Sequence, residues 1–196
     1  SFTNNKAQKG GAIIAEDATI IYCTFTNNAA NNTGGAMNCV FSYVEESDFI
    51  ENSAQHGGAI YSLEMEIYSS TFTSNTAENG GAIFGEACYV ENSTYTANTV
   101  NMNGGAINIE KWFLEVFDCQ FNDNQANMNN FGYGGAIYTE NSTNIINKSS
   151  FKQNSAFKGG AIKIRNDTDA AITDCEFISN KAYSVGEGSE WNESAS

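Results

Sequence analysis

The chain has 196 residues, of which 41% are hydrophobic and none is proline. This hydrophobic content suffices for a sizeable core and argues against a disordered chain. The 23 acidic and 9 basic residues give a formal charge of −14, which argues against nucleic acid and anionic membranes as main partners because both attract basic surfaces. No apolar run approaches the ~20 residues of a membrane helix, so we expect no direct membrane insertion.

The first predicted element, Phe2 to Ile13, contains the two halves of a repeat. An aromatic residue is followed three places later by Asn, and a Gly-Gly-Ala-Ile stretch comes next. The Gly-Gly-Ala triplet recurs along the chain at spacings of 24, 23, 23, 24, 30 and 25 residues. Its first glycines are Gly10, Gly34, Gly57, Gly80, Gly104, Gly134 and Gly159.

The aromatic half of the repeat, F/Y-x-x-N-x-A/V, occurs eight times in phase with the glycine triplet. Its aromatic positions are Phe2, Phe25, Phe49, Phe72, Tyr95, Phe121, Phe151 and Phe177. The two motifs together cover residues 1–182, which predicts one domain of a single architecture. Residues 183–196 leave the repeat, and we expect them to form a C-terminal extension.

Within each unit the apolar residues alternate with period two, as in strands. The residues three and five places after each first glycine are apolar or small, for example Ile13 and Ala15. Five places before each aromatic residue from Phe25 onward the chain has Val or Ile, such as Val44. Two places before it stands Cys or Ser, such as Ser47. Each unit is therefore expected to contain three short strands separated by bends.

A unit of this size cannot bury a face alone, so successive units must stack. The period could also suit a leucine-rich repeat, but the leucine pattern of that family is missing. The sequence thus predicts an all-β fold, a parallel β-helix (β-solenoid) with about 23–26 residues per rung and 7–8 rungs. Right-handedness follows from the general preference of parallel connections.

Stacked rungs place equivalent residues above one another at ~4.8 Å. The aromatic positions are then expected to form an internal stack. The asparagines three places later are expected to form a hydrogen-bonded ladder at a bend, because an amide offers both donors and an acceptor. These asparagines are Asn5, Asn28, Asn52, Asn75, Asn98, Asn124, Asn154 and Asn180.

The phased Gly-Gly-Ala-Ile and Phe-x-x-Asn motifs resemble the repeats of the polymorphic outer-membrane protein family and of adhesin-like proteins. The resemblance covers nearly the whole chain. It implies a right-handed β-helix exposed at a cell surface, where it serves in adhesion or as a stalk.

The five cysteines are too few and too widely spaced for a disulfide framework. Cys23, Cys119 and Cys175 share one inward position and are expected to be buried small residues. The single histidine, His56, precedes Gly57 at a variable position. We interpret this position as a loop tip, with no Ser-His-Asp set around it.

One outward column could carry a ligand. Six places after the first glycine stand Glu86, Glu110 and Glu140, followed by Arg165 on the next rung. Carboxylates one or two rungs apart approach the separations used by glycosidases. Aromatic residues two places earlier suggest a sugar-binding face. The candidate ligand or partner face comprises Tyr61, Phe84, Glu86, Glu110, Tyr138 and Glu140.

Glycosylation is a candidate modification of the surface. Sequons occur at Asn31, Asn92, Asn141, Asn147, Asn166 and Asn192. No calcium nonapeptide is present, and Asp167 with Asp169 is too small a set to define a metal site. We therefore expect no cofactor, no metal and no catalytic residue.

The sequence favours a non-enzymatic extracellular or cell-surface solenoid with a structural or adhesive role. The expected partners are glycans or proteins on host or neighbouring cells. The chain enters the repeat in mid-rung at Phe2, so we expect either further protein on the N-terminal side or end-to-end stacking of copies into a homo-oligomeric filament. The alternative is a polysaccharide-binding or polysaccharide-cleaving enzyme of the pectin-lyase type, acting through the Glu86, Glu110 and Glu140 column.

Overall fold

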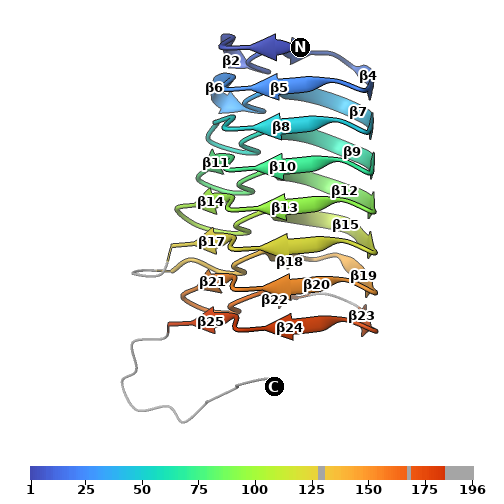
Figure 1. The fold of residues 1–196 in the computed structure, drawn as a ribbon, viewed down its shortest axis with the longest axis vertical. Coiled ribbons are helices and arrows are strands. Elements are labelled where there is room, and N and C mark those ends of the chain that lie inside the picture. Colours follow the sequence, from blue (N-terminus) through green and yellow to red (C-terminus); the bar gives the residue numbers. More distant parts are fainter. Residues whose placement is uncertain (128–130, 167–168, 184–196) are drawn as a thin grey trace.

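The computed structural model describes residues 1–127, 131–166 and 169–183. Every regular element in these ranges is a β-strand, and equivalent strands of successive repeats pair in parallel. Figure 1 shows that the chain coils right-handedly from the N-terminal end, with its turns stacked along one axis. The predicted all-β parallel solenoid is confirmed, with about 7 turns. None of the described residues forms a helix long and apolar enough to cross a membrane.

The strands form three walls of the coil. The front sheet has eight short strands, centred on the aromatic positions. Its strands in spatial order are β1 (Phe2–Thr3), β5 (Thr24–Thr26), β8 (Asp48–Ile50), β10 (Thr71–Thr73), β13 (Thr94–Thr96), β16 (Gln120–Asn122), β20 (Ser150–Lys152) and β24 (Glu176–Ile178).

A narrow wall follows the asparagine positions. It consists of β2 (Lys6–Lys9) paired with β6 (Ala29–Thr33), and of a five-stranded sheet. The strands of that sheet are β11 (Thr76–Ala77), β14 (Thr99–Val100), β17 (Gln125–Ala126), β21 (Ser155–Ala156) and β25 (Lys181–Ala182).

The third wall, the long sheet, runs from the glycine triplet to the next corner. Its strands are β3 (Ile13–Ile14), β4 (Asp17–Ile21), β7 (Met37–Glu45), β9 (Ile60–Tyr68), β12 (Ile83–Glu91), β15 (Ile107–Phe117), β18 (Ile137–Glu140), β19 (Thr143–Asn147), β22 (Ile162–Arg165) and β23 (Asp169–Thr173).

The division of each turn into strands differs from the prediction. The Gly-Gly-Ala-Ile segment and the Val/Ile segment were expected to be separate strands, but β7, β9 and β12 are continuous over 9 residues each. The third strand lies instead after the ladder asparagine, as in β11. The two halves of the long strand remain in one sheet because their backbone groups pair with the same neighbouring turns.

Left-handed residues make the corners of the coil. The first glycine of each triplet has φ between 54° and 68°, a region that glycine enters without steric cost. A Cβ on the second glycine would collide with the next turn, as at Gly58, where it would lie 2.1 Å from the carbonyl oxygen of Gly81. The glycine pair therefore sets both the turn of the chain and the close approach of adjacent turns.

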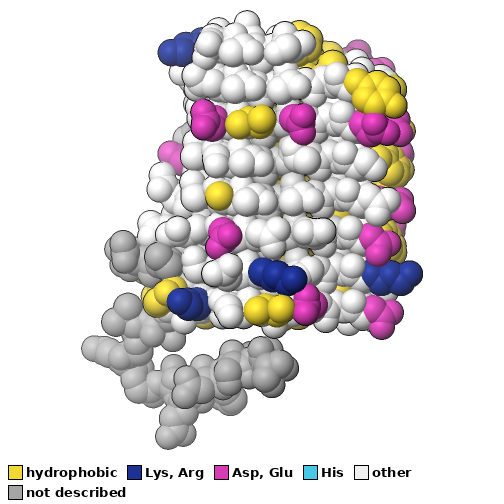
Figure 2. All heavy atoms as spheres, in the orientation of Figure 1, with side chains coloured by type: hydrophobic (Ala, Val, Ile, Leu, Met, Phe, Trp, Pro, Cys, Tyr) yellow, Lys and Arg dark blue, Asp and Glu magenta, His cyan; other side chains and the backbone are white. Residues whose placement is uncertain are grey.

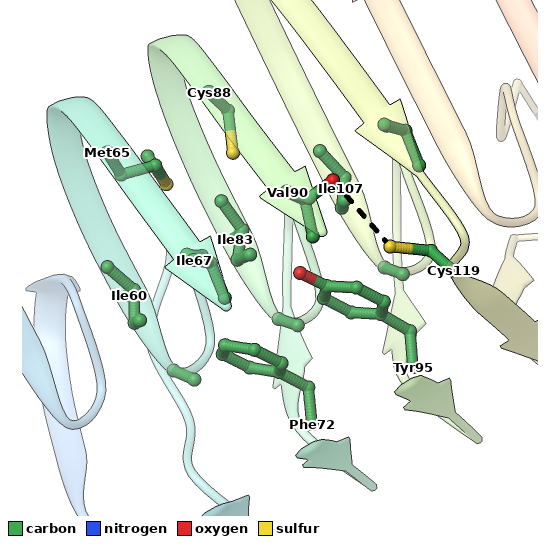
Figure 3. Packing of buried hydrophobic residues seen from close by; sticks show 14 of the residues in the cluster. Ile60, Met65, Ile67, Phe72, Ile83, Cys88, Val90, Tyr95, Ile107 and Cys119 are labelled. Atoms are coloured by element: carbon green, nitrogen blue, oxygen red, sulfur yellow. Dashed lines mark hydrogen bonds between the residues drawn. The ribbon is translucent and has the colours of Figure 1, made fainter. Parts of the chain in front are cut away.

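The eight aromatic side chains of the front sheet form one column inside the coil. Successive ring centroids lie 4.6–4.9 Å apart with interplanar angles of 7° or less. Around them pack the branched side chains of the long sheet, such as Ile67 and Val90, as Figure 3 shows. Because every ring meets its own counterpart in the next turn, the column extends through the whole described coil.

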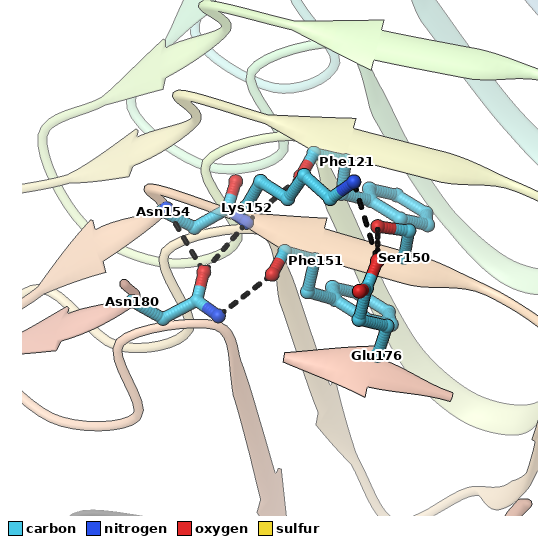
Figure 4. Close-up of polar contacts among 7 residues, drawn as sticks. All are labelled: Phe121, Ser150, Phe151, Lys152, Asn154, Glu176 and Asn180. Atoms are coloured by element: carbon cyan, nitrogen blue, oxygen red, sulfur yellow. Dashed lines mark hydrogen bonds and ion pairs between the residues drawn. The ribbon is translucent and has the colours of Figure 1, made fainter. Parts of the chain in front are cut away.

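The ladder asparagines from Asn28 to Asn154 use both donors and the acceptor of their side chains. Asn75 Nδ2 donates to Oδ1 of Asn98 at 3.0 Å and to the carbonyl of Phe49 at 2.9 Å. Its Oδ1 accepts from the backbone N–H and the Nδ2 of Asn52. The same pattern links Asn154 to Asn180 in Figure 4.

The bend at the ladder is made by the residue before each asparagine, which has left-handed geometry, such as Ser74 with φ 55° or Ala97 with φ 54°. The asparagine itself supplies the cross-turn bonds. The preceding residue supplies the bend.

The Cys/Ser position forms a second hydrogen-bonded column that the sequence did not reveal. Ser47 Oγ donates to the carbonyl of Glu45 and accepts from the backbone N–H of Cys23. All five cysteines are free. Burial raises the pKa of Cys119 to about 12, so this thiol stays protonated and acts as a small core residue.

Candidate functional site

The predicted glutamate column is only partly continuous. Glu110 pairs in register with Glu140, and Glu140 pairs with Arg165. Glu86 faces an irregularity in β15, where the register jumps. The carboxylate of Glu86 is bonded to the Nζ of Lys111, whose backbone φ of 114° marks the bulge. The expected alignment of Glu86 with Glu110 is therefore wrong, because the inserted residues place a cation at that point.

The carboxylates that remain in register differ in their surroundings. Burial and then the charge of Glu140 raise the pKa of Glu110, while His56 and Lys111 act in the opposite direction. Glu140 accepts a hydrogen bond from Tyr138 Oη at 2.8 Å and lies 3.5 Å from Arg165 Nη1. Glu86 and Glu140 thus each have a cationic partner.

The aromatic part of the predicted face is less open than expected. Tyr61 and Phe84 stack at 5.6 Å, and the ring of His56 lies 5.1 Å from Phe84. Tyr138 is only 1% exposed, with the ring of Tyr133 lying 6.4 Å away. The expected exposure of Tyr138 is therefore wrong. The residues that precede the glycine triplets fold back over this column.

His56 itself does not sit at a loop tip. Its backbone forms isolated parallel bridges to Thr33 and Asn79, and its ring is half-buried against Phe84. The prediction of a loop tip was based on the variety of residues at this position. In the coil, His56 packs against the outward Phe84 of the next turn, and Tyr133 packs against Tyr138 of its own turn.

Metal ligands and glycosylation sites complete the predicted features. Residues 1–127, 131–166 and 169–183 contain no group of three or more His, Cys, Asp or Glu side chains able to hold a metal ion. Asp167 and Asn192 lie outside the described residues. Asn147 is half-buried and its Nδ2 donates to Thr173. The exposed sequon asparagines are Asn31, Asn92, Asn141 and Asn166.

A second outward surface, on the other half of the long sheet, was not anticipated. We define the tyrosine–glutamate face as the outward side chains of Phe41–Glu45, Glu64–Tyr68, Ala87–Glu91 and Phe113–Phe117. In one column of this face the register runs Tyr43, Glu66, Tyr89 and Glu115, and in the next it runs Glu45, Tyr68, Glu91 and Phe117. Acidic and aromatic residues alternate in both directions.

This alternation keeps carboxylates from lying directly opposite one another, which would be destabilising. Figure 2 shows hydrophobic and acidic side chains interspersed down the right-hand edge, with a Lys or Arg side chain near its lower end, where the long strands turn in Figure 1. The front of the molecule carries few charged or hydrophobic side chains in the same view. The tyrosine–glutamate face is thus chemically distinct from the neighbouring wall.

The tyrosines of this face hold the carboxylates in place. Tyr43 Oη donates to Glu45 at 3.0 Å, Tyr68 Oη to Glu66 at 3.3 Å, and Tyr89 Oη to Glu91 at 2.9 Å. Burial and the hydrogen bond to Glu91 raise the pKa of Tyr89 to about 12. The phenols therefore remain protonated and keep donating to their carboxylates at neutral pH.

The rings form a zigzag along the coil. Tyr43 and Tyr68 lie 5.5 Å apart, Tyr68 and Tyr89 5.5 Å, and Tyr89 and Phe117 5.6 Å, with interplanar angles of 32–40°. Diagonal neighbours of adjacent strands are within reach of aromatic side chains. The contacts order the rings without burying them.

The tyrosine–glutamate face is hollowed into a groove of about 500 Å³. Its lining crosses successive turns of the coil from Asp17 to Glu115. The lining residues are Asp17, Ala18, Thr19, Phe41, Ser42, Tyr43, Glu64, Met65, Glu66, Tyr68, Tyr89, Phe113 and Glu115.

The sequence contained a signal for this face. In β7, Cys39 and Ser42 are both buried. They are three places apart, so the alternation of inward and outward residues that begins at the glycine triplet is broken between them. Counting back from the aromatic residue instead identifies Val44 correctly as buried. Its neighbours Tyr43 and Glu45 then point outward, as do their equivalents in later turns.

Comparison with known protein families agrees with the repeat pattern. The Chlamydia polymorphic membrane protein repeat matches residues 1–16, 46–63, 69–86 and 118–140. No curated protein and no solved structure matches the chain. The resemblance of the motifs to polymorphic outer-membrane protein repeats is confirmed.

Proposed function

We propose that this solenoid, with its repeats similar to those of Chlamydia polymorphic membrane proteins, is a non-enzymatic structural and adhesive element of a cell surface. The repeat family supports a surface location. The adhesive role goes beyond the family match. It rests on how the coil distributes its side chains.

The observation that carries the proposal is the division of each turn into buried residues that recur from turn to turn and outward residues that differ between turns. The residues that recur from turn to turn, such as Phe72, Asn75 and Gly80, are buried. They bond or stack with their counterparts. The side chains that differ between turns point outward, and the hydrogen bonds between turns hold the backbone beneath them in place. A rigid rod with a grooved face presents a contact surface at little cost in ordering entropy.

The enzymatic alternative has weaker support. A glycosidase-like pair needs one carboxyl group as acid and another as base or nucleophile. In the predicted column Glu86 is engaged by Lys111 and Glu140 by Arg165. Glu110 has the raised pKa of an acid, yet its register partner Glu140 is tied to a cation.

Adhesion can be tested with beads that carry the purified chain. We expect the beads to attach to some members of a panel of cultured cells, and soluble chain to compete. Attachment no greater than that of uncoated beads across the panel would contradict the adhesive role. A parallel assay with polysaccharide substrates would overturn the non-enzymatic assignment if turnover occurred and was lost in Glu110→Gln.

End-to-end assembly and glycosylation stay predictions. Glycans or proteins of host or neighbouring cells are the partners we propose. Electron microscopy of the purified chain tests assembly, with monodisperse particles as the contrary result. Mass spectrometry of the natural protein tests the sequons, of which exposed Asn31 and Asn141 are the first to examine.

A further inference from the structure

The groove of the tyrosine–glutamate face presents hydrogen-bond acceptors and few donors. Three tyrosine hydroxyls could have supplied donors, but each already donates to a glutamate of its own strand. The remaining polar side chains of the described lining are carboxylates, apart from the hydroxyl of exposed Thr19 at one end and that of buried Ser42. A ligand complementary to such a surface must be rich in donors and poor in acceptors.

The charge of the groove points the same way. Asp17, Glu64, Glu66 and Glu115 line it, and none of its described lining residues is Lys or Arg. Glu45 and Glu91 add two further carboxylates in the adjoining column. A concave surface with charges of one sign concentrates counter-charged ligands and speeds their association.

Among common ligand groups, the arginine side chain matches both properties. Its guanidinium has five donors and no acceptor, stays charged at neutral pH, and packs against aromatic rings. Sugar hydroxyls both donate and accept, so their acceptor lone pairs would be unused here. The tilted rings also cover part of one another's faces, at 5.5 Å between Tyr43 and Tyr68, which reduces the flat surface available to a sugar.

The length of the groove indicates an extended ligand. From Asp17 to Glu115 the lining crosses four steps between adjacent strands, or about 19 Å at ~4.8 Å a step. An extended chain advances about 3.3 Å per residue, so about six residues fit. Each turn along this path offers at least one carboxylate in or beside the groove.

We propose that the groove of the tyrosine–glutamate face binds an extended, arginine-bearing segment of a partner protein, lying along the axis of the coil. The inference rests on the proposed adhesive function and specifies the partner chemistry. Guanidinium groups bond to the carboxylates that the tyrosines hold in place, and their planes pack against the tyrosine rings. Preorganised carboxylates reduce the entropy lost on binding.

The test uses short peptides and the full chain. An acetylated Gly-Arg-Gly-Arg-Gly-Arg amide with a neutral fluorophore is titrated by fluorescence anisotropy, beside versions with lysine and with citrulline. Citrulline keeps the shape of arginine and removes its charge. We expect the arginine peptide to bind most tightly and the citrulline peptide to bind at least about tenfold more weakly. Added salt should weaken the binding of the arginine peptide.

Variants locate the site. The double variant Glu66→Gln, Glu115→Gln removes two charges from the groove. We expect it to bind the arginine peptide about tenfold more weakly. Glu51→Gln with Asp123→Asn is the matched control, since it removes the same charge from exposed residues at another corner. The control should bind like the unmodified chain. Circular dichroism checks that both double variants are folded.

Three results would overturn the inference: equal binding of citrulline and arginine peptides, equal loss in the control, or displacement of the peptide by neutral oligosaccharides. The adhesion assay separates this inference from the proposed function. Beads that adhere undiminished with Glu66→Gln and Glu115→Gln would leave adhesion intact and refute the groove as its site. Peptide binding without any adhesion would support the groove and refute the adhesive role.

Discussion

Asn75 and Asn98 occupy equivalent positions one turn apart, and the Oδ1 of Asn98 accepts from both the backbone N–H and the Nδ2 of Asn75 at 3.0 Å. Both side chains are fully buried. The link is repeated along the coil, so each asparagine closes the corner of its own turn and bonds it to the next.

Replacing one ladder residue should therefore disturb two turns. Asn75→Ala would leave the carbonyl of Phe49 and two donors of Asn52 without their partner. At about 1–3 kcal/mol for each unsatisfied group, we expect a loss of about 3 kcal/mol or more in the free energy of unfolding. Urea denaturation measures it, and Asn31→Ala at an exposed site is the control. Equal stability of the two variants would contradict the role of the ladder.

A gain in stability is expected at Tyr95. Its ring lies in the aromatic column, 4.8 Å from Phe72 and 4.9 Å from Phe121. Its hydroxyl is buried without a hydrogen-bond partner, and Figure 3 shows the oxygen directed into the apolar core. Tyr95→Phe should stabilise the chain by about 1 kcal/mol, because it removes an unpaired polar group and keeps the ring.

Thermal unfolding followed by circular dichroism would show this gain as a higher midpoint. The reciprocal change, Phe72→Tyr, introduces a hydroxyl into the same column and should lower the midpoint. A lower midpoint for Tyr95→Phe would mean that the hydroxyl has a favourable partner in solution.

The second glycine of a triplet should not tolerate a side chain. In Gly58→Ala the new Cβ would lie 2.1 Å from the carbonyl oxygen of Gly81 and 2.6 Å from that of Thr76. Both are backbone atoms of the next turn, so relief requires separating the turns. We expect a loss of about 3 kcal/mol or more. Gln55→Ala, an exposed change near the same corner, should be nearly neutral, and urea denaturation compares the two.

The raised pKa of Glu110 predicts a pH dependence of stability. Burial and the charge of Glu140 favour the protonated acid in the folded chain. The folded state then binds a proton more tightly than the unfolded state, so stability falls as pH rises from the unfolded pKa of Glu through the raised folded value. His56 and Lys111 reduce the shift.

Glu110→Gln removes this titration. We expect the variant to be more stable than the unmodified chain at neutral pH, and the difference to shrink as the pH falls towards the ordinary range of Glu. Urea midpoints measured between pH 4 and pH 7 would show it. A difference that grows on acidification would mean that the carboxylate is stabilised by its cationic neighbours instead.

The repeated inward residues were predictable because of the geometry of stacking. In a parallel coil each side chain meets the copy of itself one turn away, so the residue that packs or bonds well with itself recurs. Phe25, Phe49 and Phe72 could be assigned to one column from their spacing alone. The same holds for Asn28 and Asn52.

The surface could not be predicted as well. On the next turn, Tyr43 lies beside Glu66 and the ring of Tyr68, and these contacts depend on register between residues more than twenty positions apart. An inserted pair of residues near Lys111 shifts that register and gives Glu86 a cation in place of Glu110. No short window of sequence contains this information.

The sequence by itself determined the turn, its period and the identity of the core, because those features depend on each residue meeting its own copy. Only the tertiary structure decided which outward side chains share a face, that Tyr138 is covered, and that tyrosines hold the carboxylates of a groove. The shared face depends on unlike residues from different turns, whereas the covering of Tyr138 and the tyrosine–glutamate bonds join unlike residues of one turn. Their contacts are fixed by strand register, bulges and the bends between sheets, which act over distances that sequence periodicity does not record.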